Sequence, residues 1–285
     1  MRFFASFLLI SMALVAPTMA GGVVETAAQV EAELGGRVGV LLQQRGQAPS
    51  AEYRADERFP LASTFKALAC GAVLADVDAG EQKLSSIIKY DRGALVPYSP
   101  VTEKHVGDGM TIADLCDAAI TLSDNTAGNL ILDSIGGPKG LTAFLRRSGD
   151  KVTRLDRWEP ELNEALPGDP RDTTTPRAVT ATLERLLFSD LLAPPSRFQL
   201  ERWMIADQVA DELIRANLPD GWVIADKTGA GERGSRSIIA VIRPPSGKPW
   251  LAAIYLTGNG ADLRTRNQAI AKIGAAMIEA IRSRP

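Results

Sequence analysis

Strand-like patterns stand at the two ends of this chain, and helical patterns fill its middle. A short apolar run rich in β-branched residues covers 38–42, and three similar runs, at 222–225, 237–242 and 250–256, lie in the last third. Short links that contain Gly or Pro separate these three runs, which favours antiparallel pairing. Because both ends carry strands and the middle does not, the two ends are expected to complete one sheet.

Helical periodicity dominates the chain between the strand-like runs. Helices are expected at 63–79, 115–135, 138–147 and 176–187, with Gly and Pro clusters between them. A last long helix is expected after Asp262, a suitable N-cap residue. Four apolar side chains share one face of that helix: Ile270, Ile273, Met277 and Ile281.

These patterns predict the fold class and the domain organisation. We expect an α/β (α+β) protein with an antiparallel sheet flanked by helices and an inserted all-helical domain. Residues 21–60 and 207–285 would form the sheet domain, and residues 61–206 the helical domain. The cleft between two such domains is the usual place for a small-molecule site.

The first twenty residues have the features of an export signal. Arg2 supplies a positive start, an apolar run covers 3–15, and Ala20 ends a small-residue cleavage site. The apolar run is too short for a comfortable membrane span, and no other stretch approaches one. We therefore expect an exported protein, periplasmic or secreted, with no membrane anchor once residues 1–20 are removed.

Charge and histidine content argue against several classes of protein. The formal net charge of −2 gives no indication of a nucleic-acid or membrane partner. The only histidine, His105, stands in a polar segment that is typical of a solvated loop. A single histidine excludes a multi-histidine zinc site, and no phosphate-binding or dinucleotide motif is present. We expect no metal and no cofactor, a small-molecule substrate and a monomer.

Ser63 and Lys66 form an S-x-x-K pattern that could support nucleophilic catalysis. On a helix this spacing puts the two side chains on one face. A serine hydroxyl needs a neighbouring base to become a nucleophile, and a lysine in a dry pocket can lose enough basicity to act as one. Alone the pattern is weak, because a surface helix with a solvated lysine is the common alternative.

Three further elements follow Ser63 in order. An S-D-N element occupies 123–125, Glu159 and Asn163 stand four residues apart, and a K-T-G element occupies 227–229. On one helical turn, Glu159 and Asn163 could hold a water molecule between carboxylate and amide. Taken singly, each element has an ordinary structural interpretation. The S-D-N element also fits an N-cap cluster, the segment with Glu159 a capped helix start, and the K-T-G element a lysine on an edge strand.

The ordered set S-x-x-K, S-D-N, E-P-E-L-N and K-T-G resembles that of the class A serine β-lactamases of the penicillinase type, over essentially all of the mature chain. The resemblance implies the serine β-lactamase and penicillin-binding protein fold. It also implies hydrolysis of the β-lactam amide bond of penicillins and early cephalosporins through an acyl-serine intermediate, and so β-lactam resistance. No cofactor is implied.

The resemblance assigns roles to residues of this sequence. Four would be catalytic: Ser63, Lys66, Ser123 and Glu159. Eight would bind substrate: Tyr98, Asn125, Asn163, Lys227, Thr228, Gly229, Ala230 and Arg236. Either Lys66 or Glu159 could be the base of acylation, and the sequence leaves that choice open.

The resemblance also bears on cross-links and ion pairs. Cys70 and Cys116 match a pair that some family members bridge, and export favours that disulfide over two buried free thiols. Arg157 and Asp172 bracket the E-P-E-L-N segment and could close it by a salt bridge. Family carbapenemases often carry a cysteine pair at the positions of Ala62 and Gly231, which this chain lacks.

Two other functions share part of this signature. A D-Ala-D-Ala carboxypeptidase would have the three serine and lysine motifs but remain acylated by lactams, and it usually carries a membrane anchor. A non-catalytic β-lactam sensor domain would need a membrane-linked signalling segment. Glu159 with Asn163 favours the β-lactamase over both, because a base that activates water turns the acyl-enzyme over.

Overall fold

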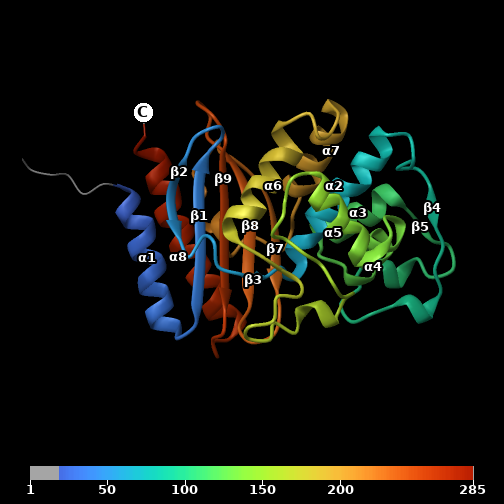
Figure 1. Cartoon of the computed structure of the whole chain (residues 1–285), viewed down its shortest axis with the longest axis horizontal. Coiled ribbons are helices and arrows are strands. Elements are labelled where there is room, and N and C mark those ends of the chain that lie inside the picture. The colour runs from blue at the N-terminus through green and yellow to red at the C-terminus, as the bar shows by residue number, and fades with distance from the viewer. Residues whose placement is uncertain (1–18, 285) are drawn as a thin grey trace, which may run out of the picture.

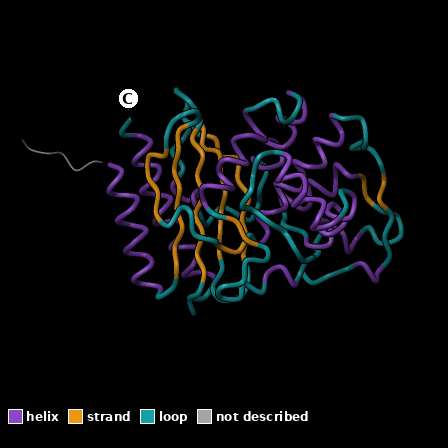
Figure 2. The backbone as a smooth tube through the Cα atoms, in the orientation of Figure 1, coloured by secondary structure: helices purple, strands orange, loops and turns teal. Residues whose placement is uncertain are grey.

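A five-stranded antiparallel sheet stands at the centre of the structure, a computed structural model that describes residues 19–284 (Figures 1 and 2). Its strand order is β2-β1-β9-β8-β7. The strands are β1 (Arg37–Gln44), β2 (Pro49–Tyr53), β7 (Val223–Ala230), β8 (Arg236–Arg243) and β9 (Trp250–Thr257). Strands from the two ends of the chain thus pair in one sheet, as the sequence predicts, and β7 is an edge strand.

Alternation along the central strands separates two hydrophobic cores. In β8, Ile238, Ala240 and Ile242 belong to one core, whereas Ile239 and Val241 belong to the other. Successive side chains of a strand point to opposite faces, so a strand buried on both faces is apolar throughout. This explains the continuous apolar runs of the C-terminal third.

Two terminal helices cover one face of the sheet, α1 (Met19–Leu34) and α8 (Leu263–Arg282). The Asp262 side chain caps α8 by accepting a hydrogen bond from the backbone N–H of Thr265 at 2.8 Å. All four apolar residues predicted for the inner face of this helix are buried. The expected C-terminal helix across the sheet is therefore confirmed.

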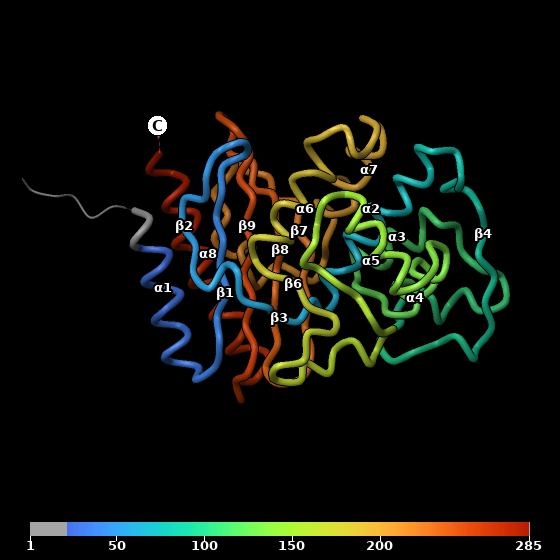
Figure 3. The backbone as a smooth tube through the Cα atoms, in the orientation of Figure 1, coloured from blue at the N-terminus to red at the C-terminus, as the bar shows by residue number. Residues whose placement is uncertain are grey.

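The remaining helices lie on the other face and beyond edge strand β7 (Figure 3). They are α2 (Phe65–Asp78), α3 (Ile112–Thr121), α4 (Asn125–Ser134), α5 (Gly137–Arg147), α6 (Pro176–Phe188) and α7 (Pro194–Ile205). Helix α2 is the central one: every residue from Phe65 to Leu74 is buried, and α2 contacts the other five helices. A disulfide joins Cys70 of α2 to Cys116 of α3 with their Cα atoms 5.8 Å apart, which confirms the expected pairing.

Short elements complete the chain. Two-residue strands pair as β3 (Phe59–Pro60) with β6 (Thr173–Thr174) and as β4 (Ile87–Ile88) with β5 (Met110–Thr111). Single 3₁₀ turns cover Ala62–Thr64, Arg92–Ala94, Thr102–Lys104, Glu161–Asn163 and Ile214–Asn217. The first of these turns leads directly into α2 and carries Ser63.

The structure corrects several predicted elements. A single helix over 115–135 is wrong: α3 ends at Thr121, Ser123 has a left-handed backbone with φ +59°, and Asp124 caps the new helix α4. Local periodicity continues through this break because both helices present apolar faces to the same core. Periodicity also leaves α1, β2 and α7 unpredicted.

The predicted export signal, 1–20, lies outside the described residues apart from its last two. Within residues 19–284, no helix combines the length and apolar character needed to cross a membrane.

Candidate active site

Ser63 and Lys66 meet at the beginning of α2. Lys66 is 1% exposed, and its Nζ donates hydrogen bonds to Ser63 Oγ at 2.9 Å, to the backbone oxygen of Ser123 at 2.8 Å and to Asn125 Oδ1 at 2.7 Å. Lys66 thus occupies the buried position, not the solvated one. Burial lowers the pKa of Lys66, and the nearby carboxylate of Glu159 opposes that shift. The amine therefore gives up its proton more readily than an exposed lysine.

Glu159 contacts both Ser63 and Lys66. Its Oε1 accepts from Ser63 Oγ at 3.4 Å and lies 3.3 Å from Lys66 Nζ, and the side chain is buried. The Asn163 amide donates to Glu159 Oε2 at 2.5 Å. Asn163 Oδ1 is buried and has no hydrogen-bond partner among residues 19–284. The Glu159 carboxylate therefore lies next to the serine hydroxyl, and the Asn163 amide lies next to that carboxylate.

A second buried lysine, Lys227 of β7, approaches Ser123. Its Nζ donates to Ser123 Oγ at 3.2 Å and to the backbone oxygen of Thr228 at 3.1 Å. Burial lowers the pKa of Lys227 to about 8, while the Asp207 carboxylate acts in the other direction. The three motifs S-x-x-K, S-D-N and K-T-G thus converge, with Ser123 between two buried amines.

A buried acidic cluster lies behind Lys227 and was not predicted from the sequence. Asp226 accepts two hydrogen bonds from Arg215, at 2.9 and 3.0 Å. Asp207 accepts from the backbone N–H of Val209 at 2.8 Å, and its other oxygen has no partner among residues 19–284. Burial raises the pKa of both carboxyl groups. This cluster supplies the negative charge that opposes the loss of the Lys227 proton.

The S-D-N element also holds the segment that carries Tyr98. Asp124 is fully buried and accepts from the backbone N–H groups of Val101 and Thr102 at 2.9 and 3.0 Å. The backbone N–H of Asn125 donates to the backbone oxygen of Tyr98 at 2.9 Å. Asp124 is therefore a structural residue, and Tyr98, 58% exposed, stands at the open side of the site.

Backbone strain gathers around these residues. Ala62, Tyr98 and Ser123 have positive φ angles of 42°, 66° and 59° although none is glycine. Such conformations cost about 1–3 kcal/mol each and persist where the surrounding structure demands them. Each of the three residues lies at or beside a predicted site position.

The predicted substrate-binding residues of β7 and β8 line up beside the serine. Arg236 is held by Asn267 Oδ1 at 2.8 Å and by the backbone oxygen of Gly229 at 3.1 Å. A Cβ at Gly229 would stand 2.6 Å from Ser237 Oγ and 3.1 Å from Ala62 Cβ. Only glycine therefore lets β7 approach the turn that carries the nucleophile. Ala230 follows at the exposed end of the strand.

Two residues of α4 support the site without any motif having indicated them. Asn129 clamps the backbone of Glu159: its Nδ2 donates to the Glu159 oxygen at 3.0 Å, and its Oδ1 accepts from the Glu159 N–H at 2.9 Å. A Cβ at Gly128 would lie 2.8 Å from Lys66 Cε, so glycine leaves room for that lysine. The one available signal was the i, i+4 spacing of Asn125 and Asn129.

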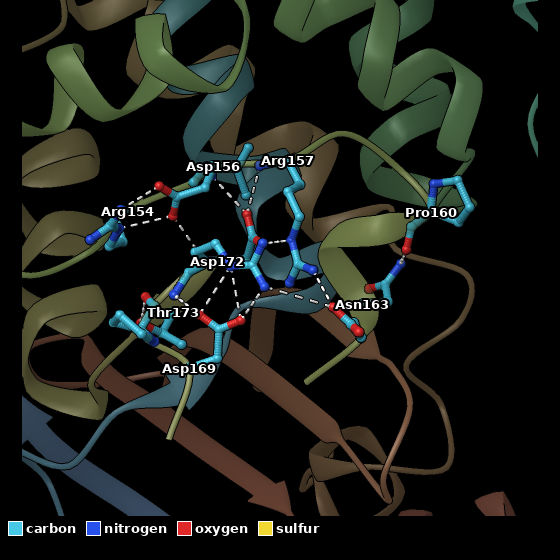
Figure 4. A network of polar contacts seen from close by, with 12 residues as sticks. Arg154, Asp156, Arg157, Pro160, Asn163, Asp169, Asp172 and Thr173 are labelled. Atoms are coloured by element: carbon cyan, nitrogen blue, oxygen red, sulfur yellow. Dashed lines mark hydrogen bonds and ion pairs between the residues drawn. The ribbon is translucent and has the colours of Figure 1, made fainter. Parts of the chain in front are cut away.

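The segment 154–175, called the Glu159 loop, is held by ion pairs (Figure 4). Arg157 Nε lies 2.6 Å from Asp172 Oδ2, and Asp172 also accepts from the backbone N–H groups of Asp156 and Arg157 at 2.7 and 2.9 Å. Arg157 pairs with Glu164 as well. The expected Arg157–Asp172 bridge is confirmed, and buried Asp172 is its anchor. The Glu159–Pro160 peptide bond in this loop is cis.

His105 is exposed and takes no part in the cluster, which confirms its placement in a solvated loop. Among residues 19–284, no group of three or more His, Cys, Asp or Glu side chains is arranged to hold a metal ion. The groups that converge at the site are a serine hydroxyl, two amines and a carboxylate.

Comparison with known proteins agrees with this geometry. Residues 23–281 match the model of the β-lactamase enzyme family. A reconstructed ancestral class A β-lactamase is 55% identical, over 90% of this chain and 99% of that one, with a TM-score of 0.88. The reconstructed class A enzyme of the last common ancestor of Gram-negative bacteria is 54% identical, over 91% and 99%, with a TM-score of 0.89.

A double mutant of that second ancestor, bound to 5(6)-nitrobenzotriazole, has the same identity, the same coverages and the same TM-score. The family match covers nearly the whole described chain, and the structural matches extend through the sheet and the helices alike. The chain belongs to the class A serine β-lactamases and is a β-lactam hydrolase.

Proposed function

We propose that this enzyme opens β-lactams through an acyl-serine intermediate formed on Ser63. The observation that carries the proposal is the placement of Ser63 Oγ, with Lys66 Nζ at 2.9 Å and Glu159 Oε1 at 3.4 Å. One hydroxyl is thus in contact with two groups able to take its proton. This is the arrangement that nucleophilic catalysis requires.

In acylation, Lys66 removes the Ser63 proton as Oγ attacks the lactam carbonyl carbon. The shorter contact and the lowered pKa of Lys66 favour it over Glu159 as this base. The backbone N–H groups of Ser63 and Ala230 receive the developing oxyanion. Ser123 then delivers its hydroxyl proton to the lactam nitrogen as the C–N bond breaks, and the proton that Lys66 took from Ser63 passes to Ser123. The contacts of Ser123 with Lys66 and Lys227 support this role.

In deacylation, Glu159 activates a water molecule that attacks the acyl ester. Asn163 Oδ1, which is buried and has no partner in the described part of the chain, supplies the second acceptor for that water next to the Glu159 carboxylate. The Ser63 ester breaks and Ser63 Oγ recovers a proton. This step separates a β-lactamase from a D-Ala-D-Ala carboxypeptidase or a lactam sensor, both of which keep the acyl group.

The substrate carboxylate lies between Lys227, Thr228 and Arg236. Lys227 and Arg236 are buried cations on neighbouring strands, and the planar Arg236 fork suits a carboxylate. Asn125 and Gly229 bind the amide of the substrate side chain, with Tyr98 at the rim. Every penicillin and cephalosporin carries the carboxylate and the lactam amide that these groups recognise.

The preferred substrates are penicillins and early cephalosporins. The Arg157–Asp172 bridge holds the Glu159 loop against the site, which limits room for bulky oxyimino side chains. Ala62 and Gly231 cannot form the cysteine bridge common in family carbapenemases. We therefore expect a penicillinase that is inhibited by clavulanate-type compounds, is weak on carbapenems and confers β-lactam resistance.

Turnover of a chromogenic cephalosporin by the purified mature protein tests the reaction, and intact-protein mass spectrometry after rapid quenching tests the acyl-enzyme. Catalytic efficiencies on benzylpenicillin, an oxyimino-cephalosporin and a carbapenem test the spectrum. If either of the last two equals benzylpenicillin, the narrow spectrum is wrong. A stoichiometric burst without further turnover would instead support the carboxypeptidase or the sensor.

We also propose that the enzyme is exported, to the periplasm or the medium, and acts as a monomer after removal of residues 1–20. The domain limits given above would describe its two parts. The export-type pattern at the start of the sequence supports the location. Cell fractionation with N-terminal sequencing of the mature protein tests location and cleavage, and light scattering tests the monomer.

A further inference from the structure

A cavity of about 340 Å³ lies beside the Glu159 loop. The loop forms one wall, and the ends of β1, β3 and β9 form the other. The volume is at the lower end of the range for small-molecule pockets. Neither Ser63, Lys66, Ser123, Glu159 nor Lys227 lines this loop cavity, so it is separate from the candidate active site.

Part of the loop cavity is apolar. Pro60 closes it on the sheet side, and Leu162, Ala165, Leu166 and Pro170 line it on the loop side. Leu162 is buried, whereas the others are partly or fully exposed. The apolar part of a small ligand would be removed from water when it packs against this wall.

The charged residues of the loop cavity leave an excess of positive charge. All three carboxylates are already paired: Glu57 with Arg37 at 3.0 Å, Asp169 with Arg171 at 2.6 Å, and Asp172 with Arg157. The four arginines that line the cavity are Arg37, Arg58, Arg171 and Arg233. Two of them, Arg58 and Arg233, have no carboxylate within 4.0 Å among residues 19–284.

These two guanidinium groups also keep unused donors. Within residues 19–284, Arg58 donates through Nη1 alone, to the backbone oxygen of Val152 at 3.0 Å and to Thr173 Oγ1 at 2.9 Å. In the same part of the chain, Arg233 donates through Nε alone, to the backbone oxygen of Glu164 at 3.2 Å. A guanidinium carries five N–H donors in a planar fork that matches a carboxylate. The remaining donors of both groups are therefore available to an anion in the loop cavity.

We propose that the loop cavity is a binding site for a small organic monoanion with an apolar body, such as an aromatic carboxylate. The carboxylate is held by Arg58 and Arg233, and the ring packs against Pro60, Leu162 and Leu166. Because Arg233 also holds the Glu164 backbone, a bound anion links the Glu159 loop to the strand ends. The binding itself does not depend on the proposed acyl-serine reaction.

The test measures binding of naphthalene-2-carboxylate to the mature protein by calorimetry and by thermal shift. A ligand of this size binds with Kd on the order of 1 mM. We expect Arg233→Gln and Arg58→Gln each to weaken binding about tenfold, since each removes a charged donor. Arg233 is exposed, so its variant keeps the fold. Naphthalene-2-carboxamide, the neutral analogue, should bind at least tenfold more weakly.

Two matched controls locate the site. Arg202→Gln removes an exposed arginine of α7 outside the loop cavity and should leave Kd unchanged. Arg236→Gln removes an arginine proposed for substrate binding and should also leave Kd unchanged. The proposal is wrong if no saturable binding occurs up to 10 mM (about tenfold above the expected Kd), if the neutral amide binds equally well, or if Arg236→Gln is the variant that loses binding. A protein that binds the probe but fails to turn over lactams refutes only the proposed function.

Discussion

The two walls of the active site are held in place by different forces. Ser63, Lys66 and Lys227 lie on or beside α2 and β7. Helix α2 is buried over its first ten residues, and β7 pairs with β8 along its whole length. Glu159 and Asn163 lie on the Glu159 loop, which contains only one 3₁₀ turn and a two-residue strand. That loop is held by ion pairs and by side chains bonded to backbone.

This difference divides the proposed reaction. The elements that carry the groups needed for acylation are held by the two hydrophobic cores. Loss of a single charged side chain leaves that apolar packing in place. The groups needed for deacylation depend on Asp172, Arg157 and Asn129. We call α2 and β7, with the cores behind them, the frame of the site. Substitutions that act on the Glu159 loop should therefore slow deacylation more than acylation, whereas substitutions in the frame should slow both steps.

Loss of the nucleophile should give the largest effect. In Ser63→Ala, neither half of the reaction can proceed, and kcat/KM on benzylpenicillin should fall by about 10⁴-fold or more. Steady-state hydrolysis measures this, and mass spectrometry should find no covalent adduct. Comparable turnover by Ser63→Ala would refute the serine mechanism.

Removal of the loop carboxylate should separate the two halves. With Glu159→Gln, acylation persists through Lys66 while deacylation slows by about 10²–10⁴-fold, the usual contribution of a general base. Benzylpenicillin should then accumulate as an adduct of intact-lactam mass. Absence of both adduct and turnover would instead assign the acylation base to Glu159.

Breaking the anchor of the loop should give a smaller effect of the same kind. Asp172→Asn removes one of the two carboxylates that Arg157 faces. Breaking a buried pair costs about 3–5 kcal/mol of unfolding free energy, and the lower end is expected because Arg157 is partly exposed and keeps its pair with Glu164. Deacylation should slow about tenfold with acylation little changed. Stopped-flow kinetics and urea unfolding measure the two effects. Asp169→Asn, in the more exposed pair with Arg171, is the control and should cost less than about 1 kcal/mol.

The smallest predicted effect is a decline of kcat/KM at high pH, caused by Lys227 of the frame. Lys227 binds the substrate carboxylate only while protonated, and its pKa is about 8, so kcat/KM should be retained below pH 8 and decline as the pH rises through it. Lys227 faces Asp207, Asp226, Lys66 and Arg236. Lys227→Arg, which stays charged, should move the decline to higher pH. An unchanged profile would assign the decline to another group.

Much of the frame was predictable because its signals are local. The continuous apolarity of 237–242 and 250–256 reflects burial on both faces of a central strand, and the Asp262 cap acts within one helical turn. The order of the four motifs was likewise enough for the family and the candidate site residues. Each of these inferences needs only neighbouring residues and their spacing.

The supporting contacts of the site were not predictable, because they join residues far apart in sequence. Asn129 clamps Glu159 across thirty positions, and the Asp207 carboxylate acts on Lys227 through a fold that the sequence pattern does not describe. The break at Ser123 runs against the local periodicity, since backbone strain there is sustained only by the packed structure. Spacing predicted which side chains carry the chemistry. Long-range packing alone set their distances, their burial and hence their pKa values.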